Sequence, residues 1–182
     1  MRAQILDAAE ELIAARGLHS SPLALIAKRA GVAVGTLYNY FADRDALIRA
    51  LFESRRAVLK PKLLAAASNA QALPFEPRLR QFVRDLLAAF EEHRRFVKVA
   101  TETEHLKIQP TSTASDLVTA IETIVDAGVA ERVLGGDKAA LLKLVIPGAI
   151  KGVIMRRTID GAAFVDDADA IVSIILDGAR RR

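Results

Sequence analysis

The sequence predicts an all-α protein in which an N-terminal three-helix domain, with a helix-turn-helix, precedes a larger helical bundle. Apolar residues recur at helical spacing along almost all of the 182 residues, and turn-forming residues fall between these runs. Residues 27–41 form a distinct pattern, in which a helix ends at a glycine and a tight turn leads into a short, uncharged second helix. We therefore expect about nine helices and no strands.

The first two helices are predicted from their apolar faces and from the residues that begin and end them. Gly17 ends the first helix, and Ser21-Pro22 begins the second, because serine can cap free amides and proline is tolerated in a first helical turn. Gly31 ends the second helix, where a positive φ is usual and glycine adopts it without a clash. The apolar faces are Ile5, Ala8, Ala9, Leu12 and Ile13 in the first helix and Leu23, Ile26 and Ala27 in the second.

The third helix is short, and the fourth is long. The third covers about Val34 to Tyr40, with Leu37 and Phe41 available to pack inward. Asp43 is predicted to cap the fourth, which should run to about residue 64 with a kink or break at Pro61. Its inner face includes Leu47, Ile48, Leu51 and Phe52.

One loop and four further helices are predicted in the remainder of the chain. Residues 71–77 hold two prolines and are the clearest loop. The helices are expected at about 77–105, with room for a break beyond Arg95, from 112 or 115 to 129, at 137–156 and at 166–180.

Composition and charge exclude several classes of protein. The net charge is +4 and the pI about 9.6, and residues 1–60 hold nine Lys and Arg against six Asp and Glu. This balance supports phosphate contact, although an ordinary solvated surface would explain an excess of this size. The absence of cysteine excludes disulfides and thiol chemistry. No signal peptide is readable, and the longest apolar stretch, 144–155, is too short for a membrane span, so we expect a soluble cytoplasmic protein with no membrane partner.

The short third helix carries side chains suited to reading DNA. Thr36, Tyr38 and Tyr40 offer hydroxyls to phosphate oxygens, and the amide of Asn39 can pair with N6 and N7 of adenine. Gly35 lets the backbone approach a phosphate closely. The cations lie around this helix rather than in it, at Lys28, Arg29, Arg44 and Arg49. The alternative is an α-hairpin whose aromatics are core residues and whose polar residues are a solvated surface.

Many residues of the N-terminal segment together form one pattern of fixed spacing. They are Ile5 to Ala9, Leu12, Arg16-Gly17, Ile26-Ala27, Ala30 to Val32, Gly35 to Tyr38, Tyr40-Phe41 and Ala46-Leu47. In this pattern the chain resembles tetracycline-repressor-type (TetR-family) transcriptional regulators over about residues 3–52. The resemblance implies a DNA-binding domain at 1–45, with the helix-turn-helix at about 23–42, and an effector-binding and dimerisation domain at 46–182.

The resemblance also implies roles for individual residues. Thr36, Tyr38 and Tyr40 would contact the DNA backbone, and Arg44 would contact a phosphate. Together with the residues chosen for their chemistry, the predicted DNA-binding set is Lys28, Val34, Gly35, Thr36, Tyr38, Asn39, Tyr40 and Arg44.

Three positions depart from the family pattern. Ala33 stands where Ser or Thr is usual, Val34 where a polar residue is usual, and Ala24 where a polar or arginine contact is frequent. The chain also lacks the basic arm that many members carry before the first helix. Ala33 and Val34 could instead contact thymine methyls. The alternative that these departures favour is a small-molecule-binding module of the same fold that has lost operator binding.

The last two long helices are predicted to form a homodimer. Residues 141–155 are apolar on nearly every side, and Gly148 and Gly152 would allow another helix to approach closely. The alternative is that both helices belong to a single-chain core. The predicted interface residues are Leu141, Leu144, Gly148, Gly152, Ile171 and Ile175.

The resemblance further implies a small-molecule effector within the bundle, whose identity the sequence does not disclose. Lys151 could meet an acidic ligand, pair with a carboxylate or extend to solvent. The other predicted ligand-binding residues are Phe90, Phe96, Val97, Thr101, Glu104, His105 and Met155, many of which are equally suited to packing.

No metal, cofactor or catalytic residue is predicted. Glu102 and His105 have the spacing of half a di-iron site, but a second copy and further carboxylates on facing helices are missing. No Ser-His-Asp order, phosphate loop or paired-glycine fingerprint occurs, so an enzyme is not expected. The sequence thus predicts a homodimeric regulator, most simply a ligand-responsive repressor, which binds a near-palindromic operator in double-stranded DNA.

Overall fold

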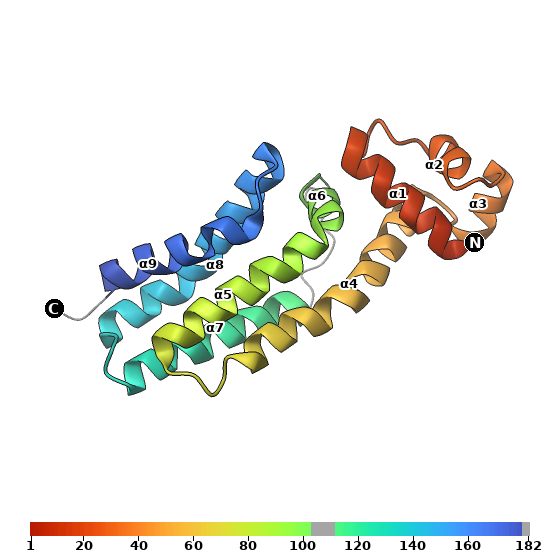
Figure 1. The fold of residues 1–182 in the computed structure, drawn as a ribbon. Helices are drawn as coiled ribbons and strands as arrows, with labels where there is room; N and C mark the ends of the chain where they lie inside the picture. Colours follow the sequence, from red (N-terminus) through yellow and green to blue (C-terminus); the bar gives the residue numbers. More distant parts are fainter. Residues whose placement is uncertain (103–111, 180–182) are drawn as a thin grey trace. The chain divides into compact units, whose positions relative to one another are not determined.

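The computed structural model describes residues 1–102 and 112–179, and these residues form helices and turns without a strand (Figure 1). The predicted all-α fold class is confirmed. No helix in the described ranges has the length and apolarity needed to cross a bilayer. The elements are α1 (Arg2–Arg16), α2 (Leu23–Arg29), α3 (Val34–Tyr40), α4 (Arg44–Asn69), α5 (Phe75–Glu92), α6 (Arg94–Glu102), α7 (Ser112–Ala130), α8 (Gly136–Asp160), the short 3-10 helix η2 (Phe164–Asp167) and α9 (Ala168–Ala179).

The chain divides into two compact units, and each of them is discontinuous in sequence. Unit 1 comprises residues 1–58 and 93–109, and unit 2 comprises residues 59–92 and 110–182. Helix α4 contributes to both units, because the boundary falls within it. The predicted division at residue 45 separates functions rather than packing units, and it stays a prediction.

The core of unit 1 joins α1, the first part of α4 and α6. The predicted apolar face of α1 is buried throughout, from Ile5 to Ile13. Phe52 of α4 meets Phe96 of α6 edge to face, with ring centroids 5.1 Å apart. Arg55 ties α4 to α1, because its Nε lies 2.5 Å from Glu10 Oε2 and its Nη2 pairs with Asp7. The aromatic pair thus joins α4 to α6, and the forked ion pair joins α4 to α1.

Of the two predicted N-cap residues, Asp43 for α4 and Ser21 for α2, only Asp43 caps its helix. Asp43 caps α4 as predicted, since its Oδ1 accepts a hydrogen bond of 2.6 Å from the amide of Ala46. The prediction that Ser21 caps α2 is wrong. Pro22 is the N-cap residue, and the fully buried Ser21 hydroxyl donates to the carbonyl of Gly17 at 2.9 Å. Ser21 therefore holds the preceding turn instead of the helix.

Pro61, predicted to kink or break a helix, and Pro77, predicted to end a loop, both lie inside helices. Helix α4 continues past Pro61 to Asn69, so the predicted break does not occur. Pro61 removes the hydrogen bond to the carbonyl of Ala57, and both residues are exposed, so water can satisfy that carbonyl. Pro77 lies in the first turn of α5, where an amide is not needed, and the predicted loop is correspondingly shorter.

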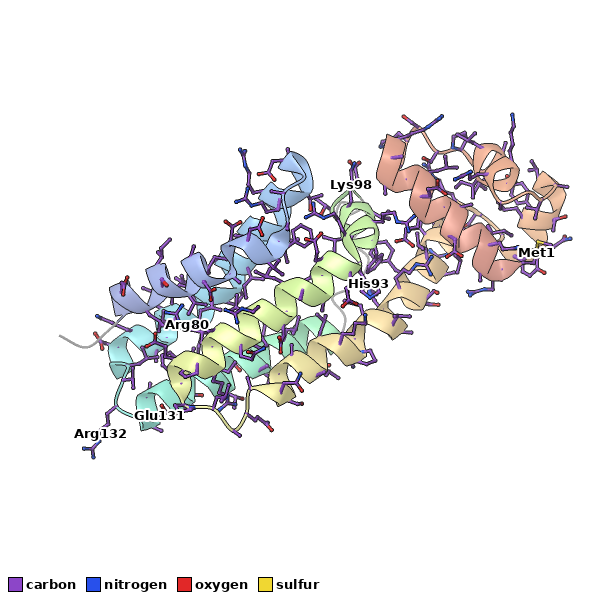
Figure 2. All side chains as sticks on the ribbon, in the orientation of Figure 1. Met1, Arg80, His93, Lys98, Glu131 and Arg132 are labelled. Carbon is purple, nitrogen blue, oxygen red and sulfur yellow. The ribbon has the colours of Figure 1, made fainter. Side chains whose placement is uncertain are left out.

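The core of unit 2 contains three fully buried aromatic rings, and one glycine allows two of its helices to approach closely. Phe75, Phe82 and Phe164 have no exposed surface. A Cβ at Gly128 of α7 would lie 2.7 Å from the Phe75 ring, so glycine permits the approach of α7 to α5. Glu131, which follows α7 (Figure 2), accepts hydrogen bonds of 2.9 and 3.1 Å from the amide of Phe75 at the start of α5. A carboxylate at a helix N-terminus is electrostatically favourable.

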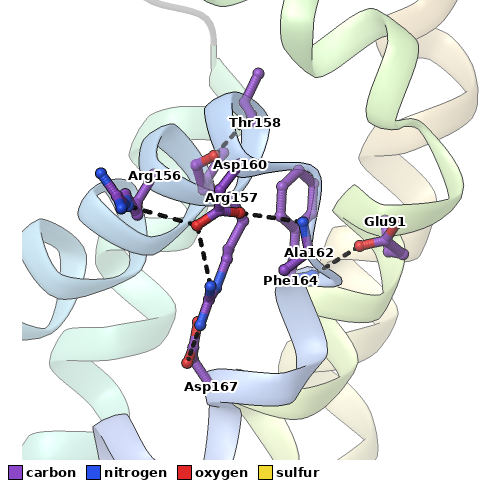
Figure 3. A network of polar contacts seen from close by, with 9 residues as sticks. Glu91, Arg156, Arg157, Thr158, Asp160, Ala162, Phe164 and Asp167 are labelled. Atoms are coloured by element: carbon purple, nitrogen blue, oxygen red, sulfur yellow. Dashed lines mark hydrogen bonds and ion pairs between the residues drawn. The ribbon is translucent and has the colours of Figure 1, made fainter.

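A polar network fixes the connection between α8 and α9 (Figure 3). Arg157 donates to Asp167 from Nε at 2.6 Å and from Nη2 at 2.8 Å, and to Asp160 from Nη1 at 3.0 Å. The hydrogen bond from Arg157 lowers the pKa of Asp167. The amide of Ala162, together with Arg157, lowers the pKa of Asp160. Both carboxylates are therefore stabilised in the ionised form.

The 3-10 helix η2 lies in this connection and was not predicted. Its first amide, on Phe164, donates to the carboxylate of Glu91 in α5 at 2.7 Å. The ring of Phe164 is completely buried in unit 2. A side chain from another helix thus anchors the turn, and sequence periodicity contains no sign of such an anchor.

Asp167→Asn is expected to lower the free energy of unfolding at pH 7 and to weaken its dependence on acid. Arg157 lowers the folded-state pKa of Asp167, so the carboxylate stabilises the fold fully above its unfolded pKa and loses this contribution as pH falls through the folded pKa. Urea titrations at several pH values between about 2 and 7 would measure both effects. Asp166→Asn, at an exposed neighbour outside the network, should change little. Equal losses in the two variants would contradict a specific role for Asp167.

Candidate nucleic-acid interface

The turn between α2 and α3 depends on Gly31, as predicted. Its φ is 71°, and a Cβ at this position would meet nothing within 4 Å, so backbone conformation rather than space requires glycine. The amide of Gly31 donates to Lys28 at 3.2 Å and that of Val32 donates to Ala27 at 3.0 Å. These two bonds form a Schellman motif, which ends α2 and directs the chain into α3.

Two apolar side chains hold α3 against unit 1. Leu37 has no exposed surface and Phe41 is 3% exposed, so the expected inward positions are confirmed. The predicted DNA-reading side chains lie at the surface of the same short element. Tyr38 is 52% exposed and Tyr40 46% exposed. Val34, Gly35 and Asn39 are also exposed, and Thr36 is half-buried.

The departure at Ala33 has a structural meaning. Ala33 is the N-cap residue of α3, with φ −67° and ψ 148°, and no side chain caps the helix there. Ser or Thr at this position could accept a hydrogen bond from an amide of the first turn, whereas alanine cannot. The first turn of α3 therefore lacks the stabilisation that a hydroxyl cap would provide.

Arg44 is the cation whose surroundings most favour an external anion. It is the first residue of α4, where the helix dipole disfavours a positive charge. Its Nε and Nη2 are buried and have no hydrogen-bond partner among the described residues. Buried donors without acceptors cost about 1–3 kcal/mol each. No acceptor in the described part of the chain would therefore hold the Arg44 guanidinium back from a phosphate.

The neighbouring cations are not equivalent. Lys28 and Arg49 are exposed. Arg29 is engaged, because its Nε donates to Glu11 Oε2 at 3.0 Å and its Nη2 pairs with Glu11 Oε1. This hydrogen-bonded pair lowers the pKa of Glu11. Arg29 thus joins α2 to α1, and its role as a surrounding cation for DNA stays a prediction.

Arg2 is a further candidate for contact with DNA that was not predicted from the sequence. Its guanidinium lies 5.6 Å from the centroid of the Phe41 ring, directly after α3. The ring of Tyr40 is 6.4 Å from that of Phe41. The signal for it in the sequence is a basic residue at the start of α1.

The described residues of the predicted effector set are divided between the two units. Phe96 and Val97 are buried in unit 1, where Phe96 is occupied by its contact with Phe52. Thr101 is exposed, and its hydroxyl donates to the carbonyl of Val97 at 3.1 Å. In unit 2, Phe90 is half-buried, whereas Lys151 and Met155 are exposed on α8. Glu104 and His105 lie outside the described residues.

The predicted dimer residues fall into two groups. Leu141 and Leu144 are 62% and 74% exposed, and a Cβ at Gly148 or Gly152 would meet nothing within 4 Å. Ile171 and Ile175 are only 9% and 8% exposed, so they belong to the core of unit 2 and offer no outer surface. The exposed apolar residue in that part of α9 is Ile174, at 75%.

Metal ligation finds no support in the described ranges. No group of three or more His, Cys, Asp or Glu side chains there is arranged to hold an ion. The half-site spacing of Glu102 and His105 includes a residue outside these ranges.

Comparison with known proteins identifies the N-terminal segment. Residues 5–51 match the sequence model described as "Bacterial regulatory proteins, tetR family". The fatty acid metabolism regulator protein of Bacillus subtilis is 48% identical over 52 residues, which are 29% of this chain and 27% of that protein. The HTH-type transcriptional regulator BetI of Burkholderia thailandensis is 36% identical over 88 residues, which are 48% of this chain and 43% of that protein. In these matches the chain covers less than half the length of each relative.

The similarity of fold extends over the whole chain. The crystal structure of the transcriptional regulator FadR from Bacillus subtilis, in complex with stearoyl-CoA, superimposes with a TM-score of 0.72 and 19% identity. The match covers 99% of this chain and 100% of that one. At this identity the likeness concerns the fold, and the named relatives are regulators rather than enzymes.

Ala33→Ser is expected to raise the free energy of unfolding of the protein by about 0.5–2 kcal/mol, because a serine oxygen at the N-cap can accept a bond from the first turn of α3. Urea denaturation followed by circular dichroism measures the change. Ala57→Ser, at an exposed position inside α4, makes the same chemical change without a cap and should cost about 0.5 kcal/mol. A loss of stability in Ala33→Ser would show that the α3 amides cannot use a hydroxyl.

Proposed function

We propose that the chain, whose residues 5–51 match the tetR family of bacterial regulatory proteins, is a member of that family and acts as a cytoplasmic, ligand-responsive repressor of transcription. It binds double-stranded DNA as a homodimer, with one α3 from each copy in successive major grooves. The centres of the two half-sites would lie about 34–36 Å apart.

The observation that carries this proposal is the division of labour within residues 34–44. Leu37 and Phe41 face inward and fix α3, while Tyr38 and Tyr40 remain about half exposed. Arg44, with two guanidinium nitrogens that have no partner among the described residues, follows directly. Hydroxyls and a cation suit the phosphate backbone, and the exposed amide of Asn39 suits a base edge.

Arg44→Ala and Asn39→Ala should weaken DNA binding in different ways. Loss of Arg44 removes a phosphate contact, so affinity falls for all sequences and the slope of log affinity against log salt decreases by about 1. Loss of Asn39 should cost about 1–3 kcal/mol at one base position and relax the preference there. Binding to a duplex library at several salt concentrations measures both effects.

The control for this experiment is Arg132→Ala, which removes the same charge from an exposed arginine of unit 2. It should leave both preference and salt slope unchanged. A wild-type protein that binds every duplex equally would contradict the repressor and support the alternative, a small-molecule-binding module that has lost its operator.

The second copy is expected on an apolar stripe of α8. Leu141, Leu144 and Ile159 are each more than 60% exposed along this helix. The two glycines of the stripe have open space on their own chain, so packing within one chain does not explain them. Close contact with another helix does explain them. Val145 and Met155 lie on the same stripe, at 41% and 40% exposure. Met155, chosen as an effector contact, is better placed for the interface.

Leu144→Glu is expected to convert the dimer to a monomer, because it places a charge on the apolar stripe. Gly148→Leu should have the same effect through its bulk, although a single chain has room for the side chain. Sedimentation equilibrium measures the change in mass. Val118→Glu, at a 43% exposed position of α7, is the control and should remain a dimer. A dimer in both α8 variants would contradict this interface.

The effector is proposed to act through the helical bundle. The crystal structure of FadR, which has a similar fold, contains stearoyl-CoA. Long-chain acyl-CoA is therefore a reasonable first compound to test for release of DNA. An effector shifts the protein only as far as it binds the non-operator state more tightly. Release of DNA by acyl-CoA would assign the class, and its failure would exclude this class without affecting DNA recognition.

A further inference from the structure

A pocket lies within unit 2 between α4, α5 and α7. Its volume is about 280 Å³, which is near the lower end of the range for small-molecule sites. We refer to it as the α4–α5–α7 pocket. Its lining residues are Leu64, Ala67, Ser68, Gln71, Arg78, Asp116, Thr119, Ala120 and Thr123. Six of these nine residues carry hydroxyl, amide or charged groups, which can form directed bonds with a ligand.

Arg78 is the unusual member of this lining. It is half-buried in the first turn of α5, and its Nε is buried without a hydrogen-bond partner. Among the described residues its guanidinium forms no ion pair, although its own amide donates to the carbonyl of Pro74 at 2.9 Å. Other arginines of α5 are engaged, as Arg84 is with Asp169 at 3.0 Å. A half-buried guanidinium with an unmade bond beside a cavity is suited to an incoming anion.

The other polar groups of the pocket determine which hydrogen bonds a ligand could form there. The hydroxyl of Ser68 donates to Leu64 at 3.1 Å and that of Thr123 donates to Thr119 at 2.8 Å, so their protons are already used. Gln71 and Thr119 retain donors that could support an anion.

The negative charge of the pocket is also accounted for. Asp116 Oδ2 lies 3.0 Å from Lys60 Nζ, so the one carboxylate in the lining is neutralised by a cation. Both side chains are 37% exposed, which leaves Asp116 able to accept a further bond from a hydroxyl. An anion can therefore approach Arg78 without facing an uncompensated negative charge.

We propose that the α4–α5–α7 pocket binds a small hydroxylated organic anion, whose carboxylate or phosphate pairs with Arg78 and whose hydroxyl donates to Asp116. Arginine binds both anionic groups in a forked geometry, so the residue alone does not separate them. This inference rests on the proposed function. It makes the pocket the effector site and names a class of effector that differs from the acyl-CoA bound by FadR, so release of DNA by acyl-CoA alone would contradict it.

The test uses the full-length protein without DNA and three probes, L-malate, succinate and glycerol 3-phosphate. Arginine Nε–Hε signals in nitrogen–proton NMR spectra report directly on Arg78, and sodium chloride at equal ionic strength controls for screening. We expect a saturable shift of the Arg78 signal. Malate should bind more tightly than succinate, which lacks the hydroxyl, by at least threefold. The comparison of malate with glycerol 3-phosphate distinguishes a carboxylate from a phosphate effector.

Variants separate a binding role from a structural one. Arg78→Gln should weaken probe binding at least tenfold, and Arg78→Lys should weaken it less, because it keeps the charge but loses the fork. Arg84→Gln, on the same helix but paired with Asp169, should bind as the wild type does. No shift at Arg78 in the wild type, or equal loss of binding in the Arg84 variant, would overturn the site; the first of these outcomes does not depend on the folding of any variant.

DNA affinity is then measured with and without the tightest probe. A probe that releases DNA from the wild type but not from Arg78→Gln supports the effector site. Saturable binding with no change in DNA affinity overturns the effector role. DNA binding in the absence of any probe is measured separately, so failure of the regulator itself is distinguished from failure of this pocket.

Discussion

A helix of seven residues is not stable in water, and α3 therefore depends on the burial of its inner face. Leu37 and Phe41 provide that burial, and each removes a large apolar surface from solvent on the side of α3 opposite to its polar residues. Gly31 sets the direction in which the helix starts, and Asp43 begins the next helix immediately after it. The exposed tyrosines and asparagine can present hydroxyls and an amide in a fixed geometry only because these constraints surround so short an element.

The described arginines include several that hold the fold and two, Arg44 and Arg78, with buried guanidinium nitrogen that lacks a partner among the described residues. Arg29, Arg55 and Arg157 each reach a carboxylate on another segment, and in unit 1 these pairs join α2 and α4 to α1. Arg44 and Arg78 differ, because each has buried guanidinium nitrogen with no acceptor in the described ranges. An incomplete hydrogen-bond set is unfavourable inside a protein, so its presence beside a surface or a pocket points to a ligand. The same residue type thus serves structure and, as we propose, recognition; the two roles differ in whether the buried guanidinium has a partner within the described residues.

Sequence reasoning succeeded where one local requirement decides the outcome. The positive φ at Gly31, the cap at Asp43 and the inward positions of Leu37 and Phe41 each follow from nearby residues. It failed where tertiary contacts decide. The pair of Arg29 with Glu11 spans 18 residues, and no periodicity selects it. In α9, apolar residues at 171, 172, 174, 175 and 176 point to several sides, so the sequence could not tell that Ile174 faces outward. The pocket around Arg78 assembles three segments and leaves no pattern in any one of them.

The division of the chain into two discontinuous units limits where the chain can be truncated without loss of the core of unit 1. The helix that completes the core of unit 1, α6, arrives only after more than thirty residues of unit 2. A fragment that ended at residue 58 would keep α3 but lose Phe96, and the ring of Phe52 would face water. The DNA-reading segment is therefore not an independent module that can be transplanted by a single cut. Its autonomy is limited by an aromatic pair contributed by a later part of the same chain.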